Sequence, residues 1–452
     1  MNKALLLMIF LRAHNFRTPE FSSIVARVTF IILVTLTDVA VANTPSSLAG
    51  YCKKNIMNAL QYKIAKAKYQ EQVSLARSQI ASVLPSANLI ASHNWAVSSF
   101  EPRDSQSDSN IQRLRLNFSQ PLFRPDSWED YVSSDFSSQL AKIQYQSAYQ
   151  TIFQGCMVSA FNVSSTREAK AHMSSILATA TERLRIANVY HLAGELSTLD
   201  AQKHTSDFDA LKTRYTEAHA AHIIALDEFS TATGGSPAVD RYTHMPTAYA
   251  ADHLPTLDDW IRIAGQHNLL VREKEIELKL AESKVIRRAA EHFPSVDLVG
   301  SINLLPPPEE KSQRHNGYAP STVSIQLTIP LYAGGRTQHG LSAERYRRER
   351  SIVELDEARL AVNSSMRRLW LSVAEASTAT VHLASASALA LKNLQANELG
   401  ITRNSLAKIA LMDAQINAIE AKKLHDQSIY QLRTSTFLLH SHAGLWDYYL
   451  PD

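Results

Sequence analysis

Four short segments of the chain alternate between apolar and polar residues with a period of two, and they form two pairs. The mainly apolar face of the first pair would comprise Ala87, Leu89, Ala91, His93 and Trp95, followed by Leu114, Leu116 and Phe118. In the second pair this face would comprise Val296, Leu298, Gly300, Ile302 and Leu304, followed by Val323, Ile325, Leu327 and Ile329. Polar residues fill the positions between them, among them Arg113, Arg115, Asn117, Gln326 and Thr328. Because successive side chains of a strand point to opposite faces, the pattern predicts four two-sided strands of about nine residues.

The remainder of the chain is predicted to form unusually long helices. No proline occurs between Asp126 and Ser236, or between Leu331 and Leu450. In the second of these stretches, steps of three and four residues trace a coiled-coil seam with one charged member: Ile352, Leu355, Arg359, Val362, Met366, Leu369 and Val373. A helix from Arg336 to about Leu399 would be roughly 95 Å long. Gly194 and Gly400 are the expected turns at which each long helix ends.

Proline and glycine mark the change from strand to helix. Pro121 and Pro330 follow the second strand of each pair, and we expect them to end the strand pairing because proline has no N–H to donate. Gly334 and Gly335 then permit the backbone conformations that a strand-to-helix turn requires. The residues expected to begin and cap the first long helix are Pro125, Asp126 and Ser127.

The two halves of the chain repeat one another. Pro85 and Pro294 are 209 residues apart, and so are Pro121 and Pro330. A fixed interval between landmarks indicates a tandem duplication. We predict a first repeat at residues 43–235, a polar connector at 236–255, a second repeat at 256–446 and a tail at 447–452.

The N-terminus has the features of an export signal. Arg27 precedes an apolar run from Val28 to about Leu36, and Ala40 and Ala42 supply an A-x-A cleavage site. The run is shorter than the ~18–20 apolar residues that span a bilayer. We predict that residues 1–42 are a signal peptide; a retained inner-membrane anchor is the alternative.

Composition narrows the class of protein only slightly. The chain has 452 residues, of which 45% are hydrophobic and 20% charged, and its net charge of +3 lacks the basic excess of nucleic-acid-binding proteins. Because the chain is predicted to be exported, its two cysteines, Cys52 and Cys156, are candidates for a disulfide. Two separate thiols are the alternative, since the sequence does not show whether the Cα atoms come within bridging distance.

Four strands are too few to close a sheet into a barrel. Strands of this length can cross a bilayer at a tilt, but an open sheet edge in lipid would leave backbone N–H and C=O groups unpaired. Other copies of the chain would have to complete the sheet, and three copies would give twelve strands. The apolar faces would then meet lipid, and the residues lining the water-filled lumen would be Arg113, Arg115, Asn117, Gln326 and Thr328.

The motifs occur in a characteristic order. Each half has a P-S-x-[N/D]-L strand, a second strand that ends in P-L-[Y/F], a helix of about 60 residues and a later D-A-Q, and the second half has the junction "PLYAGGRT". The set resembles the TolC-type outer-membrane efflux proteins over nearly all of residues 50–446. The resemblance implies a homotrimer whose twelve-stranded barrel, in the outer membrane of a Gram-negative bacterium, continues into a periplasmic α-helical tunnel. It also implies a periplasmic adaptor and an inner-membrane ABC or proton-driven transporter as partners, and the export of drugs, small molecules or secreted proteins.

The same resemblance assigns a role to two aspartates. In the family, acidic side chains constrict the periplasmic end of the tunnel, and the matching residues are Asp200 and Asp413. Two positions depart from the family pattern, because Ala410 replaces a further aspartate and Asn404 replaces a turn glycine. Solvated helix residues without a gating role are the alternative reading of the two aspartates.

Motifs of catalytic chemistry are missing from the sequence. We find no P-loop, nucleophile elbow or C-x-x-C, and we predict neither an enzyme nor a cofactor. The closest approaches to metal-ligand spacing are His219 with His222 and His440 with His442, which we interpret as surface histidines. The competing hypothesis for function is a periplasmic coiled-coil adaptor or scaffold without a pore.

Overall fold

The computed structural model describes residues 48–98, 107–234, 255–304, 321–400 and 405–445. The predicted signal peptide, the C-terminal tail, nearly all of the predicted connector and Asn404 lie outside these ranges. The first half contains α3 Leu48–Ile56, α4 Leu60–Gln79, the 3-10 helix η1 Ile80–Val83, β1 Ser86–Ser98, β2 Ser107–Phe123, α5 Pro125–Leu192 and α6 Thr198–Thr233. The second half contains α7 Leu257–His267, α8 Leu269–Ala290, β3 Ser295–Asn303, β4 Ser321–Thr328, α9 Arg336–Gly400 and α10 Ser405–His442. The mainly helical fold with four strands is as predicted.

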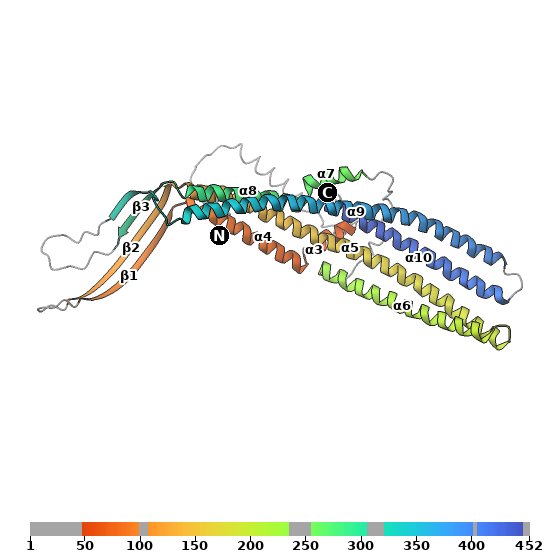
Figure 1. Ribbon diagram of the computed structural model, residues 1–452. Coiled ribbons are helices and arrows are strands. Elements are labelled where there is room, and N and C mark those ends of the chain that lie inside the picture. The colour runs from red at the N-terminus through yellow and green to blue at the C-terminus, as the bar shows by residue number, and fades with distance from the viewer. Residues whose placement is uncertain (1–47, 99–106, 235–254, 305–320, 401–404, 446–452) are drawn as a thin grey trace, which may run out of the picture. The chain divides into compact units, whose positions relative to one another are not determined.

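The four strands form one antiparallel sheet in the order β1-β2-β3-β4 (Figure 1). Each half contributes a hairpin, and β2 of the first half pairs with β3 of the second, from Arg115 opposite Asn303 to Phe123 opposite Val296. The two halves therefore share a single sheet. Within the described residues, β1 and β4 each have one strand neighbour, so both edges are open.

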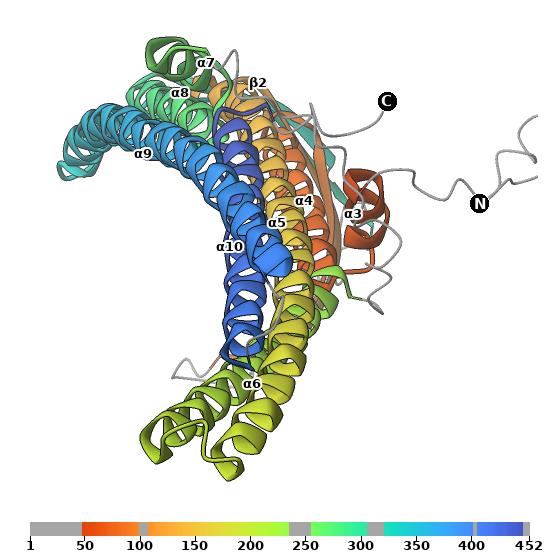
Figure 2. The same cartoon turned by 90° about the vertical axis from the view of Figure 1, so that its right-hand side faces the viewer.

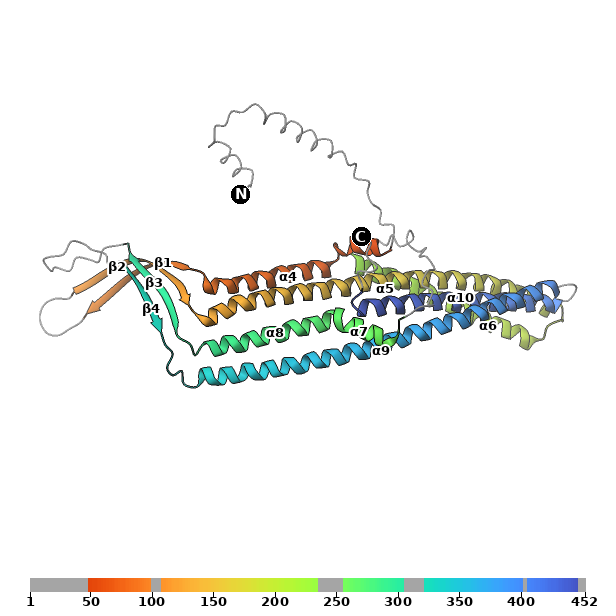
Figure 3. The same cartoon turned by 90° about the horizontal axis from the view of Figure 1, so that it is seen from above.

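The helices pack side by side in a row that continues from the sheet (Figure 3). The long helix α5 packs against α4 and α8 near the sheet and against α6 and α10 farther away, and α9 likewise packs against α8 and then α10. Figure 3 shows α4, α5, α8 and α9 side by side, extending away from one end of the four strands. Seen from the end, these helices follow a curved row (Figure 2). The long helices α5, of 68 residues, and α9, of 65 residues, therefore contact both the shorter helices near the sheet and those farther from it.

The seam of α9 differs from the prediction at two positions, Ile352 and Arg359, and Ile352 is exposed at 36%. Leu355, Val362 and Met366 are buried against α7, α8 and α10, as the heptad pattern predicts. Arg359 was predicted in the seam, and this is wrong: its side chain is exposed and pairs with Glu275 at 3.6 Å, while Ala358 is buried instead. A helix of 3.6 residues per turn accommodates this change, because positions three and four residues along lie on the same face.

Candidate functional site

The strand register separates the sheet into one apolar and one polar face. Leu116 lies opposite Leu89 on one side and Ile302 on the other, and Asn117 lies opposite Asn88 and Ser301. Arg113 and Arg115 share the polar face with Asn117, because all three occupy alternate positions of β2. Gln326 of β4 lies opposite Asp297 of β3, which itself faces β2 at Pro121. The proposed lumen residues therefore fall on one face of the sheet.

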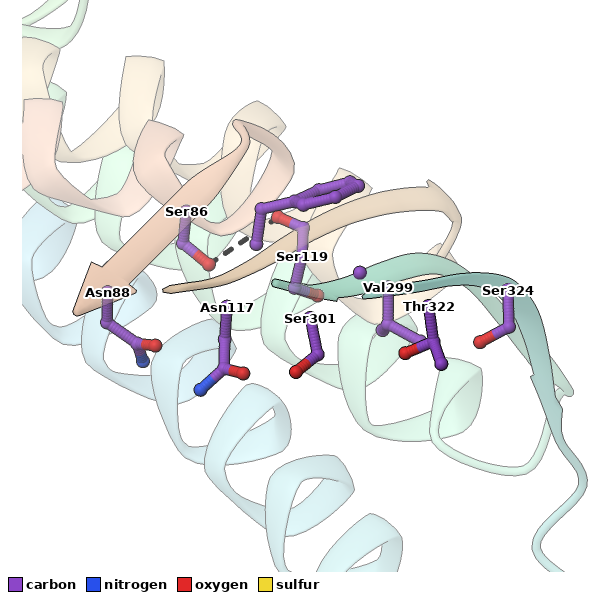
Figure 4. Close-up of a pocket in the computed structure, with 10 residues that line it drawn as sticks. Ser86, Asn88, Asn117, Ser119, Val299, Ser301, Thr322 and Ser324 are labelled. Atoms are coloured by element: carbon purple, nitrogen blue, oxygen red, sulfur yellow. Dashed lines mark hydrogen bonds between the residues drawn. The ribbon is translucent and has the colours of Figure 1, made fainter. Parts of the chain in front are cut away.

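The polar face is hollowed and lined by hydroxyl and amide groups. A hollow of about 290 Å³ lies across all four strands, and the polar residues around it are Ser86, Asn88, Asn117, Ser119, Ser301, Thr322 and Ser324. Figure 4 shows Asn88, Asn117 and Ser301 projecting from the same side of the sheet. Above this hollow Arg115 Nε donates to Asn303 Oδ1 at 3.1 Å. Such a lining can hydrogen-bond water over its whole width.

The junction below the sheet differs from the prediction in the first half. Pro121 does not end the strand pairing: β2 continues to Phe123, with a register shift between Pro121 and Phe123. A proline is tolerated there because a bulge already interrupts the regular ladder. Pro330, by contrast, lies two residues beyond the last residue of β4. Gly334 and Gly335 both have positive φ, at 63° and 81°, immediately before α9 begins.

An arginine, not the expected caps, occupies the start of α5. The N-cap position is Arg124, which has no side-chain cap bond, and Asp126 and Ser127 lie inside the first turn. Instead, Arg124 Nη2 lies 2.7 Å from Asp297 Oδ2, which joins the start of the helix to β3 of the second half. Asp297 is only 6% exposed, so this pair fixes the sheet to the helices in a partly dry environment.

The helix ends contain the two aspartates assigned by resemblance. Gly194 follows α5 with φ 78°, and α6 begins after Ser197. Ser197 Oγ accepts from the backbone N–H of Asp200 at 3.1 Å and donates to its carboxylate at 2.6 Å, so Asp200 completes a helix cap. Gly400 is the last residue of α9.

Asp413 of α10 is part of an ion-pair network with two other helices. Arg183 of α5 donates to Asp413 Oδ1 at 2.5 Å, and its Nη2 lies 3.6 Å from Asp207 Oδ2 of α6. Arg183 is 7% exposed, whereas the side chains of Asp413 and Asp207 are close to half exposed. One buried cation thus connects α5, α6 and α10 through two hydrated carboxylates.

A disulfide joins the N-terminal helix to the long helix. Cys52 of α3 and Cys156 of α5 form an S–S bond, with Cα atoms 6.0 Å apart. Both cysteines are fully buried, in a cluster that includes Phe153 and Phe229. The bond holds a nine-residue helix that is too short to be stable alone.

The candidate metal ligands have other contacts. His222 Nδ1 lies 3.3 Å from Thr166 Oγ1, His219 stacks on Tyr215, and His440 and His442 each contact a backbone carbonyl one turn earlier. Over the described residues, no group of three or more His, Cys, Asp or Glu side chains is arranged to hold a metal. Nor does any described helix have the length and apolar character needed to cross a membrane.

Arg183, Asp207, Arg124 and Asp297 were not singled out from the sequence. Of these four residues, only Arg124 stands out in the sequence, because it is a charged residue between Phe123 and Pro125 at the change from strand to helix. The partners of Arg183 and Arg124 lie 230 and 173 residues away along the chain. No local pattern reports a pairing over that separation.

Residues 260–436, from α7 into α10, match the family model described as outer membrane efflux protein. Among curated proteins, the chain is 20% identical over 309 residues to the proteases secretion protein PrtF of Dickeya chrysanthemi, and this match covers 66% of each chain. The chain thus spans about two thirds of the length of this curated relative.

Solved structures of outer-membrane channels have the same fold. The channel OprN aligns with a TM-score of 0.73 at 17% identity, over 88% of this chain and 89% of the other. The MtrE channel of Neisseria gonorrhoeae aligns with a TM-score of 0.69 at 15% identity, over 88% and 89%. The CmeC channel of Campylobacter jejuni gives 0.67 at 14% identity, over 87% and 86%. The predicted resemblance is confirmed in two respects: residues 260–436 match the outer membrane efflux protein family, and the chain has the fold of these outer-membrane channels.

Proposed function

We propose that three copies of this chain form an export channel in the outer membrane of a Gram-negative bacterium. The observation that carries the proposal is the open sheet with one apolar and one polar face, from β1 to β4. Joining β4 of one copy to β1 of the next would pair the backbone groups at both edges and close a barrel of twelve strands. Lipid would then cover the apolar face, and water would fill the polar one.

The helices extend the same argument below the membrane. Their curved row is also open at both sides, at α4 and α6 on one side and at α9 on the other. Three copies would close this row into a tunnel that begins where the barrel ends. Large exposed apolar residues of α9, among them Val353, Leu360, Leu371, Val381 and Leu389, provide surface for contacts between copies.

The proposal includes the chain's maturation and its partners. Residues 1–42 would be removed as a signal peptide, and the two repeats at 43–235 and 256–446 would be joined by the connector 236–255. The sequence contains no P-loop, so transport would depend on a periplasmic adaptor and an inner-membrane ABC or proton-driven transporter. The name of the PrtF relative supports secreted proteins as one class of cargo beside drugs and small molecules.

One preparation tests this function. The protein is extracted from outer membranes in detergent, its native mass is measured, and the same sample is inserted into a planar bilayer. We expect a trimer with discrete single-channel conductance. A monomer or dimer without conductance would contradict the proposal and would support the pore-less scaffold, which the family match and the channel structures do not favour.

A further inference from the structure

Two arginines lie next to each other on the polar face of the sheet. Arg113 and Arg115 are separated by one residue of β2, so their side chains leave the same face about 7 Å apart along the strand. Both side chains are exposed. Each guanidinium carries a delocalised positive charge and presents several N–H donors.

At the strand positions that the structure describes, no acidic residue lies across from either arginine. Arg113 is opposite Ser92, and Arg115 lies between Ile90 and Asn303. Neither arginine has an ion-pair partner among the described residues, although Arg115 donates to the amide oxygen of Asn303. Among the described residues, no carboxylate therefore compensates the positive charge on this part of the face.

The rest of the described polar face is almost neutral. Its other side chains are chiefly serine, threonine, asparagine and glutamine, which line the hollow beside Asn117 (Figure 4). The one acidic residue at the polar-face positions of the described strands is Asp297, and it pairs with Arg124. Asp297 is opposite Pro121, six residues along β2 from Arg115 and thus about 20 Å away. At that distance, and already paired with Arg124, Asp297 does not offset the positive potential of Arg113 and Arg115.

We propose that Arg113 and Arg115 form a cationic ring in the channel lumen that favours polyanionic cargo. The inference rests on the proposed trimer, in which three copies would place six guanidinium groups around one axis. Rings of Arg or Lys select anions in other pores, and a low-dielectric wall concentrates their field in the lumen. Carboxylates or phosphates on the cargo would bind the ring transiently as they pass.

Polyanion block of the conducting channel tests the ring. Single channels of the full-length trimer are recorded in a neutral bilayer, and inorganic triphosphate or a poly-glutamate peptide is added to one compartment at a time. We expect block at an approximately tenfold lower concentration from the strand end than from the helix end, because the ring lies in the sheet. Block by triphosphate alone points to small anionic cargo, and block by poly-glutamate points to acidic polypeptides.

Matched variants separate charge from structure. The double variant Arg113→Gln/Arg115→Gln is expected to lose the sided block, whereas Arg113→Lys/Arg115→Lys retains it. The control variant Arg262→Gln/Arg272→Gln removes two exposed helix arginines and so changes the net charge by the same amount. Its channels should be blocked by the polyanions as strongly as those of the wild type. Native mass and unblocked conductance show that each variant still forms the channel.

The outcomes distinguish this inference from the function on which it rests. Conductance with no sided block, or with equal block in the wild type and the glutamine variant, overturns the cationic ring and leaves the channel intact. Absence of conductance in the wild type itself overturns the proposed channel, and the ring with it.

Discussion

Arg183 on α5 donates to Asp413 on α10 at 2.5 Å, so a buried cation holds an aspartate that we assigned to the end of the tunnel. Arg183 also has a second carboxylate partner, because its Nη2 lies 3.6 Å from Asp207 Oδ2 of α6. A link of this kind fixes the spacing of three helices near their ends. In the proposed channel it would limit how far α6 and α10 move apart.

We predict that breaking this link opens the channel. Asp413→Asn would leave the buried Arg183 with only the more distant carboxylate, which costs about 1–3 kcal/mol of stability. Arg183→Met would instead release two carboxylates that are already partly hydrated. We expect both variants to increase single-channel conductance, with the larger loss of thermal stability in Asp413→Asn.

Asp200 provides the matched control for that experiment. Its carboxylate accepts from Ser197 in a helix cap, so Asp200→Ala should destabilise α6 by about 1 kcal/mol without releasing the link between helices. Asp413→Ala is further expected to weaken block by cations. Unchanged conductance and cation block in both Ala variants would remove the two aspartates from any gate.

We predict that the disulfide is required for stability. The bond between Cys52 and Cys156 closes a segment of 104 residues, and loss of such a bond typically costs about 2–5 kcal/mol. The variant Cys52→Ala/Cys156→Ala should therefore unfold at a lower temperature than the wild type in the same detergent. Addition of a reductant should lower the unfolding temperature of the wild type but not that of the variant. Equal unfolding temperatures under all four conditions would contradict this role.

The strands and long helices were predictable because their signals are local. Alternation along Leu114, Leu116 and Phe118 reports the two faces of a strand directly, and the absence of proline after Asp126 permits a helix of 68 residues. That strand pairing continues past Pro121 was not predictable, because the bulge there depends on pairing with β3, which belongs to the other half of the chain.

The ion pairs that fix the helices were beyond local reasoning for a different reason. Arg183 looks like any charged residue of a solvated helix face, and only packing against α6 and α10 makes it a buried cation. The same holds for Asp297, which lies on the polar face of β3 but pairs with Arg124 in the junction. Such roles depend on which distant elements come together.

We predict that Gly300 is required by an aromatic neighbour on the apolar face. A Cβ at Gly300 would overlap the ring of Phe118, which lies directly across the strands. Gly300→Ala should therefore displace the ring, with an expected cost of about 1–3 kcal/mol. Phe118→Leu in the same chain should recover part of that loss, because a smaller side chain leaves room for the methyl group.

The neighbouring residue Ser301 serves as the control for this test. Ser301→Ala changes the polar face at the next position of β3 and should leave heat-resistant trimer migration nearly unchanged. Additive effects of Gly300→Ala and Phe118→Leu in a double-mutant cycle would show that the two residues do not interact.

We predict that acid weakens the packing of α7 through His440. Burial lowers the pKa of His440 below its ordinary value of 6.5, although a hydrogen bond to the carbonyl of Thr436 at 2.8 Å opposes the shift. Its ring meets Trp260 of α7 edge to face, with centroids 5.0 Å apart. Because the unfolded chain binds a proton more readily at this position than the folded chain does, stability should fall as the pH drops below about 6.5, and should level off below the folded-state pKa.

The thermal unfolding temperature at pH 7.5 and pH 5 measures this effect. His440→Gln removes the titrating ring, so the decrease between the two pH values should be smaller in the variant than in the wild type. His382→Gln replaces an exposed histidine of α9 and should retain the wild-type decrease. An identical pH dependence in the wild type and His440→Gln would assign the acid sensitivity to other groups, because only the protonation of His440 distinguishes these two chains over this range.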